Sequence, residues 1–343
     1  MQEIIRLQQK IAPDVLTVLE RRYQLLKIIS LLQPIGRRSL AEQTDNPERL
    51  IRSDVEFFQE QGFVDVNAKG MTITPEGTHL VEQLSSVMNQ LSGLDDLEEQ
   101  LRKKFNLQQV IVVPGNSDDV SRVKQELGKA CVKFLQQILG EHMTIAVTGG
   151  STMSAVAKSM KPLNYENCLF VPSRGGLGEQ VENQANTICV EMAQKAKGTY
   201  RLLYVPDPIS EESYHTLIEE PAVKEILETI RQADVVIHGI GDAMTMAERR
   251  KTPAQQLEKL KDAHAVGEAF GYYFDKSGEI IHKVRTVGLQ VENLETIPHV
   301  IAVAGGASKA DAIASYFKLA HCTVLITDEA AATMLVKGNS LSI

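Results

Sequence analysis

The chain of 343 residues has no tryptophan, and its four cysteines form no C-x-x-C pair. Cys131, Cys168, Cys189 and Cys322 are scattered, which is typical of a reduced, intracellular protein without disulfides. No apolar run approaches 18 residues and the first residues contain no signal-peptide core, so we expect a soluble, cytoplasmic protein with no membrane partner.

Motifs of nucleotide, cofactor and metal chemistry are also missing. There is no G-x-x-x-x-G-K-[ST] sequence, which excludes a P-loop. Gly239-x-Gly241 lacks the third glycine of a dinucleotide fingerprint, because Met244 stands in its place. The eight histidines are dispersed without metal-ligand spacing, and Cys168 lies in an apolar run that favours the core. We therefore expect no metal and no cofactor.

The charge of the chain is unevenly distributed. Its formal net charge is −8, which argues against a general polyanion binder. Between Arg21 and Arg52, however, seven Lys and Arg stand against three acidic residues. A locally basic segment in an acidic protein indicates a specific anionic partner, of which DNA is the leading candidate.

Residues 1–75 have the pattern of a winged helix-turn-helix. Apolar spacing and helix-starting residues predict three helices, and alternating residues around Asn67–Gly70 predict a hairpin. The predicted helices are 21–33, 37–43 and 47–61, and the predicted strands are 63–66 and 71–74. Three short helices followed by a hairpin are typical of this DNA-binding fold.

The third predicted helix separates an apolar face from a basic one. We expect Arg49, Arg52 and Ser53 on its polar face to enter the major groove. Arg37 and Arg38 on the second helix would hold phosphates. The alternative is a protein-docking module whose basic face is merely solvated.

Residues 76–106 predict a linker helix with a narrow apolar seam. Its seam residues step by four and three, with a break at Ser92-Gly93, as in a short coiled coil. They are Leu80, Leu84, Val87, Leu91 and Leu94, with Leu101 in the same register. We expect a dimer contact here. The alternative is a helix that lies on its own domain.

Residues 107–343 alternate apolar runs with helical stretches, which predicts a doubly wound α/β domain. In this fold the ligand binds at the carboxyl ends of the strands. The predicted strands are 110–113, 144–148, 168–172, 201–205, 235–240, 280–287, 300–304 and 323–327.

Two strand-to-helix turns of this domain are near copies of each other. Residues 145–152 read IAVTGGST and residues 301–308 read IAVAGGAS. Such turns place free N–H groups and a helix dipole at one point, which suits an anion. Loops at the same sheet edge add cations for one or two phosphates, namely Arg174, Arg249, Arg250 and Lys309. The alternative is that the glycine pairs only permit tight turns.

Several segments together resemble the SorC/DeoR-type sugar-binding transcriptional regulators, over nearly the whole chain. They are PIGRRSLAE (34–42), VTGGST (147–152), VPSRGGLGE (171–179), NQANTI (183–188), HGIGDAMTMAERR (238–250), EAFGYYFD (268–275) and VAGGASKADAI (303–313). The resemblance implies a winged helix and an effector domain related to sugar-phosphate isomerases and deaminases. It also implies repression of glycolytic genes, with fructose-1,6-bisphosphate as effector.

The resemblance further implies which residues bind the bisphosphate. Carried onto this sequence, they are Gly149, Gly150, Ser151, Thr152, Arg174, Gln184, Arg249, Arg250, Glu268 and Lys309. Gln184 and Glu268 come from the resemblance only, as ligands of sugar hydroxyls. It also suggests that the effector loosens DNA binding and that dimers form tetramers on operator DNA.

The competing function is a sugar-phosphate isomerase or deaminase with an accessory domain. The related deaminases follow a G-x-G turn with Asp-Gly-His, which supplies acid and base groups. Here Asp242, Ala243 and Met244 follow the turn, and His238 precedes it. With this set incomplete we expect no catalytic residues and favour a sensor, although Asp242 and Glu268 leave catalysis open.

Overall fold

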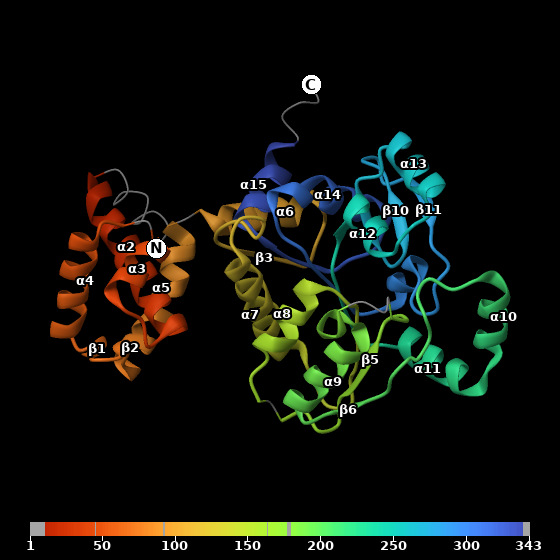
Figure 1. Cartoon of the computed structure of the whole chain (residues 1–343), viewed down its shortest axis with the longest axis horizontal. Coiled ribbons are helices and arrows are strands. Elements are labelled where there is room, and N and C mark those ends of the chain that lie inside the picture. Colours follow the sequence, from red (N-terminus) through yellow and green to blue (C-terminus); the bar gives the residue numbers. More distant parts are fainter. Residues whose placement is uncertain (1–10, 45, 92, 163, 177–179, 339–343) are drawn as a thin grey trace. The chain divides into compact units, whose positions relative to one another are not determined.

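The computed structural model describes residues 11–44, 46–91, 93–162, 164–176 and 180–338. The chain forms two compact units, Met1–Asp95 and Asp96–Ile343 (Figure 1). Within the described ranges no helix is both long and apolar enough to cross a bilayer.

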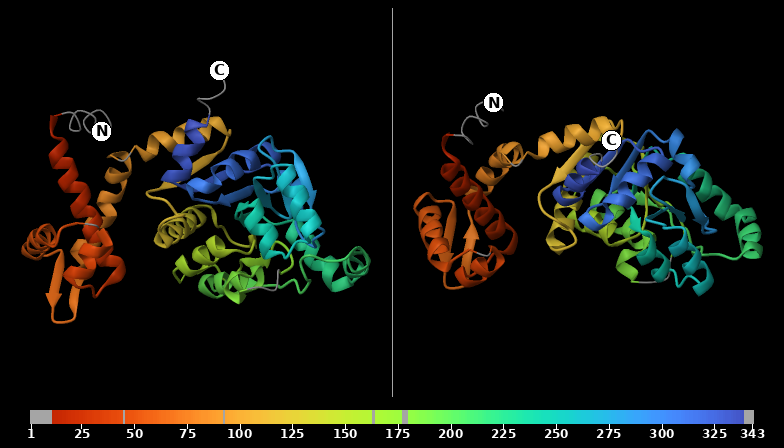
Figure 2. Two further views of the ribbon diagram at one scale, coloured as in Figure 1. Left: turned by 45° about the horizontal axis from the view of Figure 1, so that its top comes forward. Right: turned by 90° about the horizontal axis from the view of Figure 1, so that it is seen from above.

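The first unit is a winged helix-turn-helix. Its elements are α2 (Pro13–Leu32), α3 (Arg37–Thr44), α4 (Glu48–Glu60), β1 (Val64–Asn67), β2 (Gly70–Ile73) and α5 (Pro75–Leu91). The antiparallel hairpin pairs Val64 with Ile73 and Asn67 with Gly70, and it projects from the helices as the wing (Figure 2). The predicted helices and hairpin are confirmed, except that α2 begins eight residues earlier than expected.

Apolar residues at helical spacing hold this unit together. Ile51, Val55 and Phe58 on α4 are no more than 3% exposed, and they pack with Ile29 and Leu40 in one cluster. Because these residues occupy one side of α4, the opposite side of the helix is left to solvent.

The predicted linker helix is two helices. Residue 92 lies outside the described residues, α5 ends at Leu91, and α6 (Leu94–Lys104) follows. Leu80 and Leu84 are partly buried against their own unit, so intramolecular packing already accounts for them. The side chains of Val87 and Leu91 lie outside the described residues. The dimer contact therefore stays a prediction.

Helix α6 packs on the second unit. Leu101 is fully buried, and the N–H of Val112 in β3 (Gln109–Val113) donates to Glu98 Oε1 at 2.8 Å. The two compact units part between Asp95 and Asp96. The domain boundaries expected at residues 75 and 106 stay predictions.

The second unit is built on a seven-stranded parallel sheet of order β3-β13-β12-β7-β4-β5-β6. Its strands are β3 (Gln109–Val113), β4 (Thr144–Val147), β5 (Leu169–Pro172), β6 (Thr199–Tyr200), β7 (Val235–His238), β12 (His299–Val303) and β13 (Val324–Asp328). Helices flank the sheet (Figures 1 and 2). They are α7 (Ser121–Ile138), α8 (Ser151–Ser159), α9 (Ala185–Ala196), α10 (Glu211–Glu219), α11 (Pro221–Arg231), α12 (Ala243–Arg249), α13 (Ala254–Asp262), α14 (Ala310–Leu319) and α15 (Glu329–Lys337).

Two predicted strands were wrong in extent or position. Residues 201–205 form no strand, because the side-chain amide of Asn186 hydrogen-bonds the backbone of Leu203 where a neighbouring strand would pair. The N–H of Leu203 donates to Asn186 Oδ1, and Asn186 Nδ2 donates to the Leu203 carbonyl. The predicted strand 280–287 shortens to β11 (Ile280–Lys283) and leaves the parallel sheet.

Strand β11 belongs to a small antiparallel sheet that the sequence pattern did not predict. Its order is β11-β10-β9-β8, with β8 (Gly241–Asp242), β9 (Gly267–Ala269) and β10 (Tyr272–Phe274). Phe270 and Gly271 both have positive φ and turn β9 into β10. This sheet carries Glu268 to the carboxyl edge of the parallel sheet.

Candidate functional site

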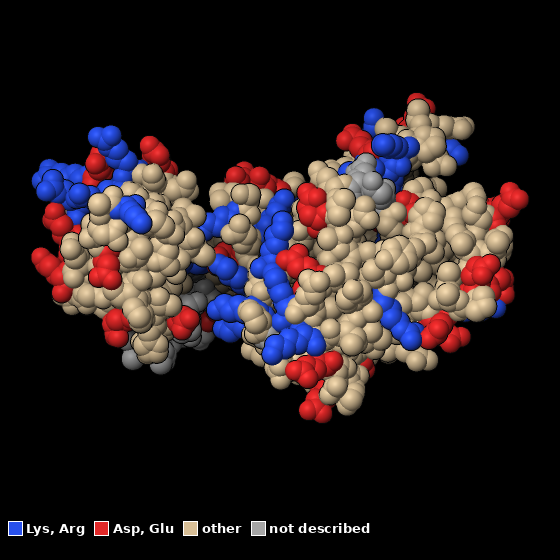
Figure 3. All heavy atoms as spheres, turned by 60° about the horizontal axis from the view of Figure 1, so that its bottom comes forward, with Lys and Arg blue, Asp and Glu red and all other residues tan. Residues whose placement is uncertain are grey.

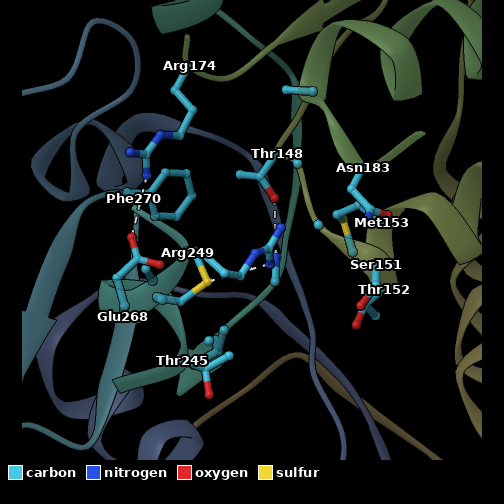
Figure 4. A pocket seen from close by; sticks show the side chains of 18 of the residues that line it. Thr148, Ser151, Thr152, Met153, Arg174, Asn183, Thr245, Arg249, Glu268 and Phe270 are labelled. Atoms are coloured by element: carbon cyan, nitrogen blue, oxygen red, sulfur yellow. Dashed lines mark hydrogen bonds and ion pairs between the residues drawn. The ribbon is translucent and has the colours of Figure 1, made fainter. Parts of the chain in front are cut away.

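A pocket of about 320 Å³ opens at the carboxyl ends of the parallel strands (Figure 4). All ten effector-site residues expected from the sequence line it: Gly149, Gly150, Ser151, Thr152, Arg174, Gln184, Arg249, Arg250, Glu268 and Lys309. Residues 177–179 of the RGGLGE motif lie outside the described residues. The common position of the ten is a feature of the fold, and their role as ligands stays a prediction.

The first glycine turn presents free donors to the pocket. Gly150 has φ of +122° and precedes α8, and its own N–H donates to the Asn183 carbonyl at 2.8 Å. The N–H groups of Ser151, Thr152 and Met153 then start the helix, where no preceding carbonyl is available. These three N–H groups have no hydrogen-bond acceptor among the described residues. The positive end of the α8 dipole therefore faces the cavity.

The second glycine turn has used its donors within the protein. The N–H of Gly306 donates to Asp328 Oδ2 at 2.7 Å, and that of Ser308 donates to Asp118 Oδ2 at 2.9 Å. These carboxylates occupy the position of an anion. The expectation that this turn, like the first, offers free N–H groups to an anion is therefore wrong for Gly306 and Ser308, and only Lys309 from this segment lines the pocket.

Two ammonium groups face the pocket near α8. Burial lowers the pKa of Lys309, the charge of Lys124 on α7 lowers it further, and the carboxylates of Asp118, Asp328 and Asp242 offset part of this effect. Neither side chain has a hydrogen bond or ion pair with any residue that the structure describes. A bound anion would relieve this repulsion. Sequence reasoning missed Lys124, which belongs to no motif.

On another wall, Arg174 and Arg250 hold Glu268. Arg250 Nη2 lies 2.8 Å from Glu268 Oε1, and Arg174 Nη1 lies 3.5 Å from it. Arg174 also pairs with the buried Asp207. Two arginines and two carboxylates thus balance one another, which makes both arginines less available to a phosphate than the sequence suggested.

The charge state of Glu268 follows from this network. Burial alone would raise its pKa, but Arg250 and Arg174 bring it below the ordinary value. The N–H of Gly271 adds a hydrogen bond to Oε1 at 2.6 Å. Glu268 is therefore an ionised acceptor, which suits a sugar hydroxyl and repels a phosphate.

The polar groups occupy two sides of the cavity. In Figure 4, Ser151 and Thr152 lie on one side, and Arg174 and Glu268 lie on the other. Arg249, the last residue of α12, lies between them. Gln184 precedes α9 as its N-cap. The arrangement offers an anion-binding end and a hydroxyl-binding end.

The groups that an enzyme would use are engaged elsewhere. His238 Nε2 contacts Tyr316 Oη at 3.0 Å and its Nδ1 lies 3.1 Å from the Gly239 carbonyl, and burial lowers its pKa to about 4. Its side chain does not line the pocket. Asp242 Oδ1 accepts from the N–H and the hydroxyl of Thr245, both at 2.8 Å. No group of three potential metal ligands occurs in the described ranges.

The first unit exposes every residue expected to contact DNA. Arg37, Arg38, Arg49, Arg52 and Ser53 are all solvent-exposed. Lys and Arg side chains gather at one end of this unit in Figure 3. The pairing of Arg52 Nε with Glu56 Oε1 at 3.0 Å leaves Arg52 mostly accessible, at 69% exposure.

Part of the basic excess in this unit is structural. Arg21 Nε and Arg22 Nε bond the carboxylate of Asp54 at 2.7 and 2.9 Å, and Asp54 is 2% exposed. Two of the seven counted cations therefore brace α2 against α4. The positive face left for DNA is smaller than the count suggested.

Fold and site define a class of protein: a DNA-binding unit joined to a sugar-binding effector domain. Family models agree, since residues 18–88 match the CggR N-terminal DNA binding domain and residues 89–337 match the sugar-binding domain. The chain belongs to the SorC-type family of sugar-binding transcriptional regulators.

Within this family the chain is similar to central glycolytic genes regulators. It is 52% identical to the one from Priestia megaterium over 98% of this chain and 99% of that protein, and 49% identical to the one from Bacillus subtilis over the same shares.

Solved structures support the same assignment. A SorC family transcriptional regulator from Enterococcus faecalis is 45% identical, covers 71% of this chain and 100% of its own, and has a TM-score of 0.66. The full-length sorbitol operon regulator SorC from Klebsiella pneumoniae shares the fold at 17% identity, with a TM-score of 0.67 over 89% of this chain and 95% of its own. These relatives are regulators, so the chain is a transcriptional regulator and not an enzyme.

Proposed function

We propose that the chain is a cytoplasmic repressor of glycolytic genes whose operator binding is weakened by fructose-1,6-bisphosphate. The observation that carries the proposal is the pocket, where free helix donors and two lysines face one side and an ionised glutamate faces the other. The glycolytic role comes from relatives that are half identical over their whole length.

The geometry supports a revised division of the site among the proposed ligands. Ser151, Thr152 and Lys309 would hold one phosphate at the start of α8, with Lys124 as an additional cation. Glu268 would accept from sugar hydroxyls. Arg249, which lies between these ends, and the carboxylate-paired Arg174 and Arg250 are the candidates for the second phosphate.

Isothermal titration with fructose-1,6-bisphosphate, fructose-6-phosphate and ribose-5-phosphate tests the effector. We expect the bisphosphate to bind at least tenfold more tightly than either monophosphate, since one further charge-assisted bond is worth about 1.5–3 kcal/mol. Equal affinities would contradict the bisphosphate. Turnover of any of the three would contradict the sensor.

We further propose that α4 reads operator DNA. Arg52→Ala should cost about 1–3 kcal/mol and relax specificity at one base pair, if this side chain reaches a guanine. Arg37→Ala should weaken all sequences alike and reduce the salt slope by about one. Unchanged affinity after replacing Arg37, Arg38, Arg49 and Arg52 together would contradict the proposal.

We also propose that the chain acts as a dimer, and as a tetramer on DNA. The seam of residues 80–94 is the candidate contact. Sedimentation of the full chain, free and with operator, measures both states. A monomer at tens of micromolar would contradict the dimer.

A further inference from the structure

A second cavity of about 740 Å³ lies in the α/β unit and has no role in the site described above. It lies between the segment that follows α12, the strand β11 and the helix α10. Arg250 lines both this cavity and the effector pocket.

The lining of the second cavity is cationic. Lys251, His282, Lys283 and Arg285 line it together with Arg250, and no Asp or Glu is among its described lining residues. One of these charges is partly offset, because Arg285 Nη2 lies 3.4 Å from Glu211 Oε2. Lys251 and Lys283 have no ion pair with any described residue. A concave surface of one charge focuses the electrostatic potential and attracts counter-ions.

The charges act on a group inside the same cavity. Burial lowers the pKa of His282, and the charges of Lys259 and Arg250 lower it further. Thr286 and Arg250 are both at least nine-tenths buried. Thr286 Oγ1 and Arg250 Nε have no hydrogen-bond partner in the described part of the chain. These two atoms lie beneath the cavity surface, whereas the basic side chains that line the cavity, with no carboxylate among its described lining residues, favour an anionic ligand.

We propose that the second cavity binds a phosphorylated small molecule, separately from the effector pocket. A phosphate ester matches Lys251, Lys283 and Arg250, since guanidinium and ammonium groups are the usual phosphate ligands, although the ammonium of Lys283 also lies 4.4 Å from the centre of the Tyr272 ring. The cavity has more than twice the volume of the effector pocket, which leaves room for an organic moiety beside Tyr214.

The shared arginine gives such a ligand a route to the first pocket. Arg250 holds Glu268 and donates to Tyr273 Oη at 3.0 Å. A phosphate that draws Arg250 toward the second cavity would weaken its hold on Glu268. Ligands of the two cavities would then change each other's affinity by the same factor.

The test uses inorganic pyrophosphate as the probe. Because the chain has no tryptophan, Tyr214→Trp places a single fluorescent reporter on the wall of the second cavity. We expect a saturable fluorescence change that equal ionic strength of sodium chloride does not produce. Adding Lys251→Ala and Lys283→Ala to this variant should weaken binding roughly tenfold or more. Lys261→Ala, on the exposed side of α13, is the control and should not change it.

Three outcomes would overturn the proposal. They are a change that does not saturate, an unchanged affinity after loss of both lysines, and loss of the signal on Lys309→Ala, which would place the probe in the effector pocket. An independent measurement uses the unmodified chain.

Bound pyrophosphate should raise the pKa of His282, which NMR follows as a pH titration of the imidazole signal. The His282→Gln variant assigns that signal. A pKa that pyrophosphate does not shift would also overturn the proposal.

Discussion

Replacing Lys309 with methionine tests whether this lysine binds the effector or stabilises the fold. In the free protein the lowered pKa of Lys309 means that its charged form is disfavoured by folding. Removing the charge while keeping the volume should therefore leave the free protein equally stable or more stable. Loss of one charge-assisted hydrogen bond to phosphate should cost about 1.5–3 kcal/mol, or roughly tenfold to a hundredfold in affinity.

Two measurements on one preparation decide this prediction. Thermal unfolding without ligand gives the stability, and isothermal titration with fructose-1,6-bisphosphate gives the affinity. Lys158→Met is the matched control, because Lys158 is exposed at the other end of α8. A lower melting temperature for Lys309→Met together with wild-type affinity would refute the reasoning, since it would make Lys309 a structural residue.

Three further predictions concern the supports of the two sites. Gly150→Ala should cost about 1–3 kcal/mol of stability and weaken effector binding, because the φ of +122° at Gly150 strains any residue with a side chain, even though an added Cβ would have no atom within 4 Å. The control Gly239→Ala should be nearly neutral in thermal unfolding and in effector titration. Glu268→Gln should lower the stability of the α/β unit by about 3–5 kcal/mol, because Arg174 and Arg250 lose the carboxylate charge with which they pair. Calorimetry measures this change, and a loss of stability under about 1 kcal/mol would contradict the network. Asp54→Asn should lower the stability of the winged helix by about 2–3 kcal/mol at neutral pH. The pKa of Asp54 is lowered, so its contribution is present above the ordinary value and fades as the pH falls through the lowered one, and the variant's unfolding should be less sensitive to acid in that range.

The sequence sufficed to predict the winged helix and most of the effector pocket. Periodicity defines α4 because Ile51, Val55 and Phe58 share one face, and that spacing also exposes Arg49 and Arg52. The pocket residues were predictable because parallel strands bring their carboxyl ends to one edge. Gln184 and Glu268 needed the family resemblance, since neither lies in a pattern with chemical meaning of its own.

The features that the sequence did not predict depend on long-range pairing. The two glycine turns are alike in sequence, and only the fold brings Asp118 and Asp328 onto the second one. The small antiparallel sheet has strands of two to four residues, too short to show a period. Lys124 approaches the pocket from a different helix, and Asp54 neutralises two arginines that precede it by more than 30 residues.

The coupling between the two units is the central claim, and one titration measures it directly. Full-length protein is titrated into fluorescently labelled operator DNA, and anisotropy is recorded with and without saturating fructose-1,6-bisphosphate at one salt concentration. The account predicts that the bisphosphate weakens operator affinity by about 5- to 150-fold, a coupling of about 1–3 kcal/mol, and that operator weakens bisphosphate binding equally. An operator affinity that is identical with and without the bisphosphate would contradict it.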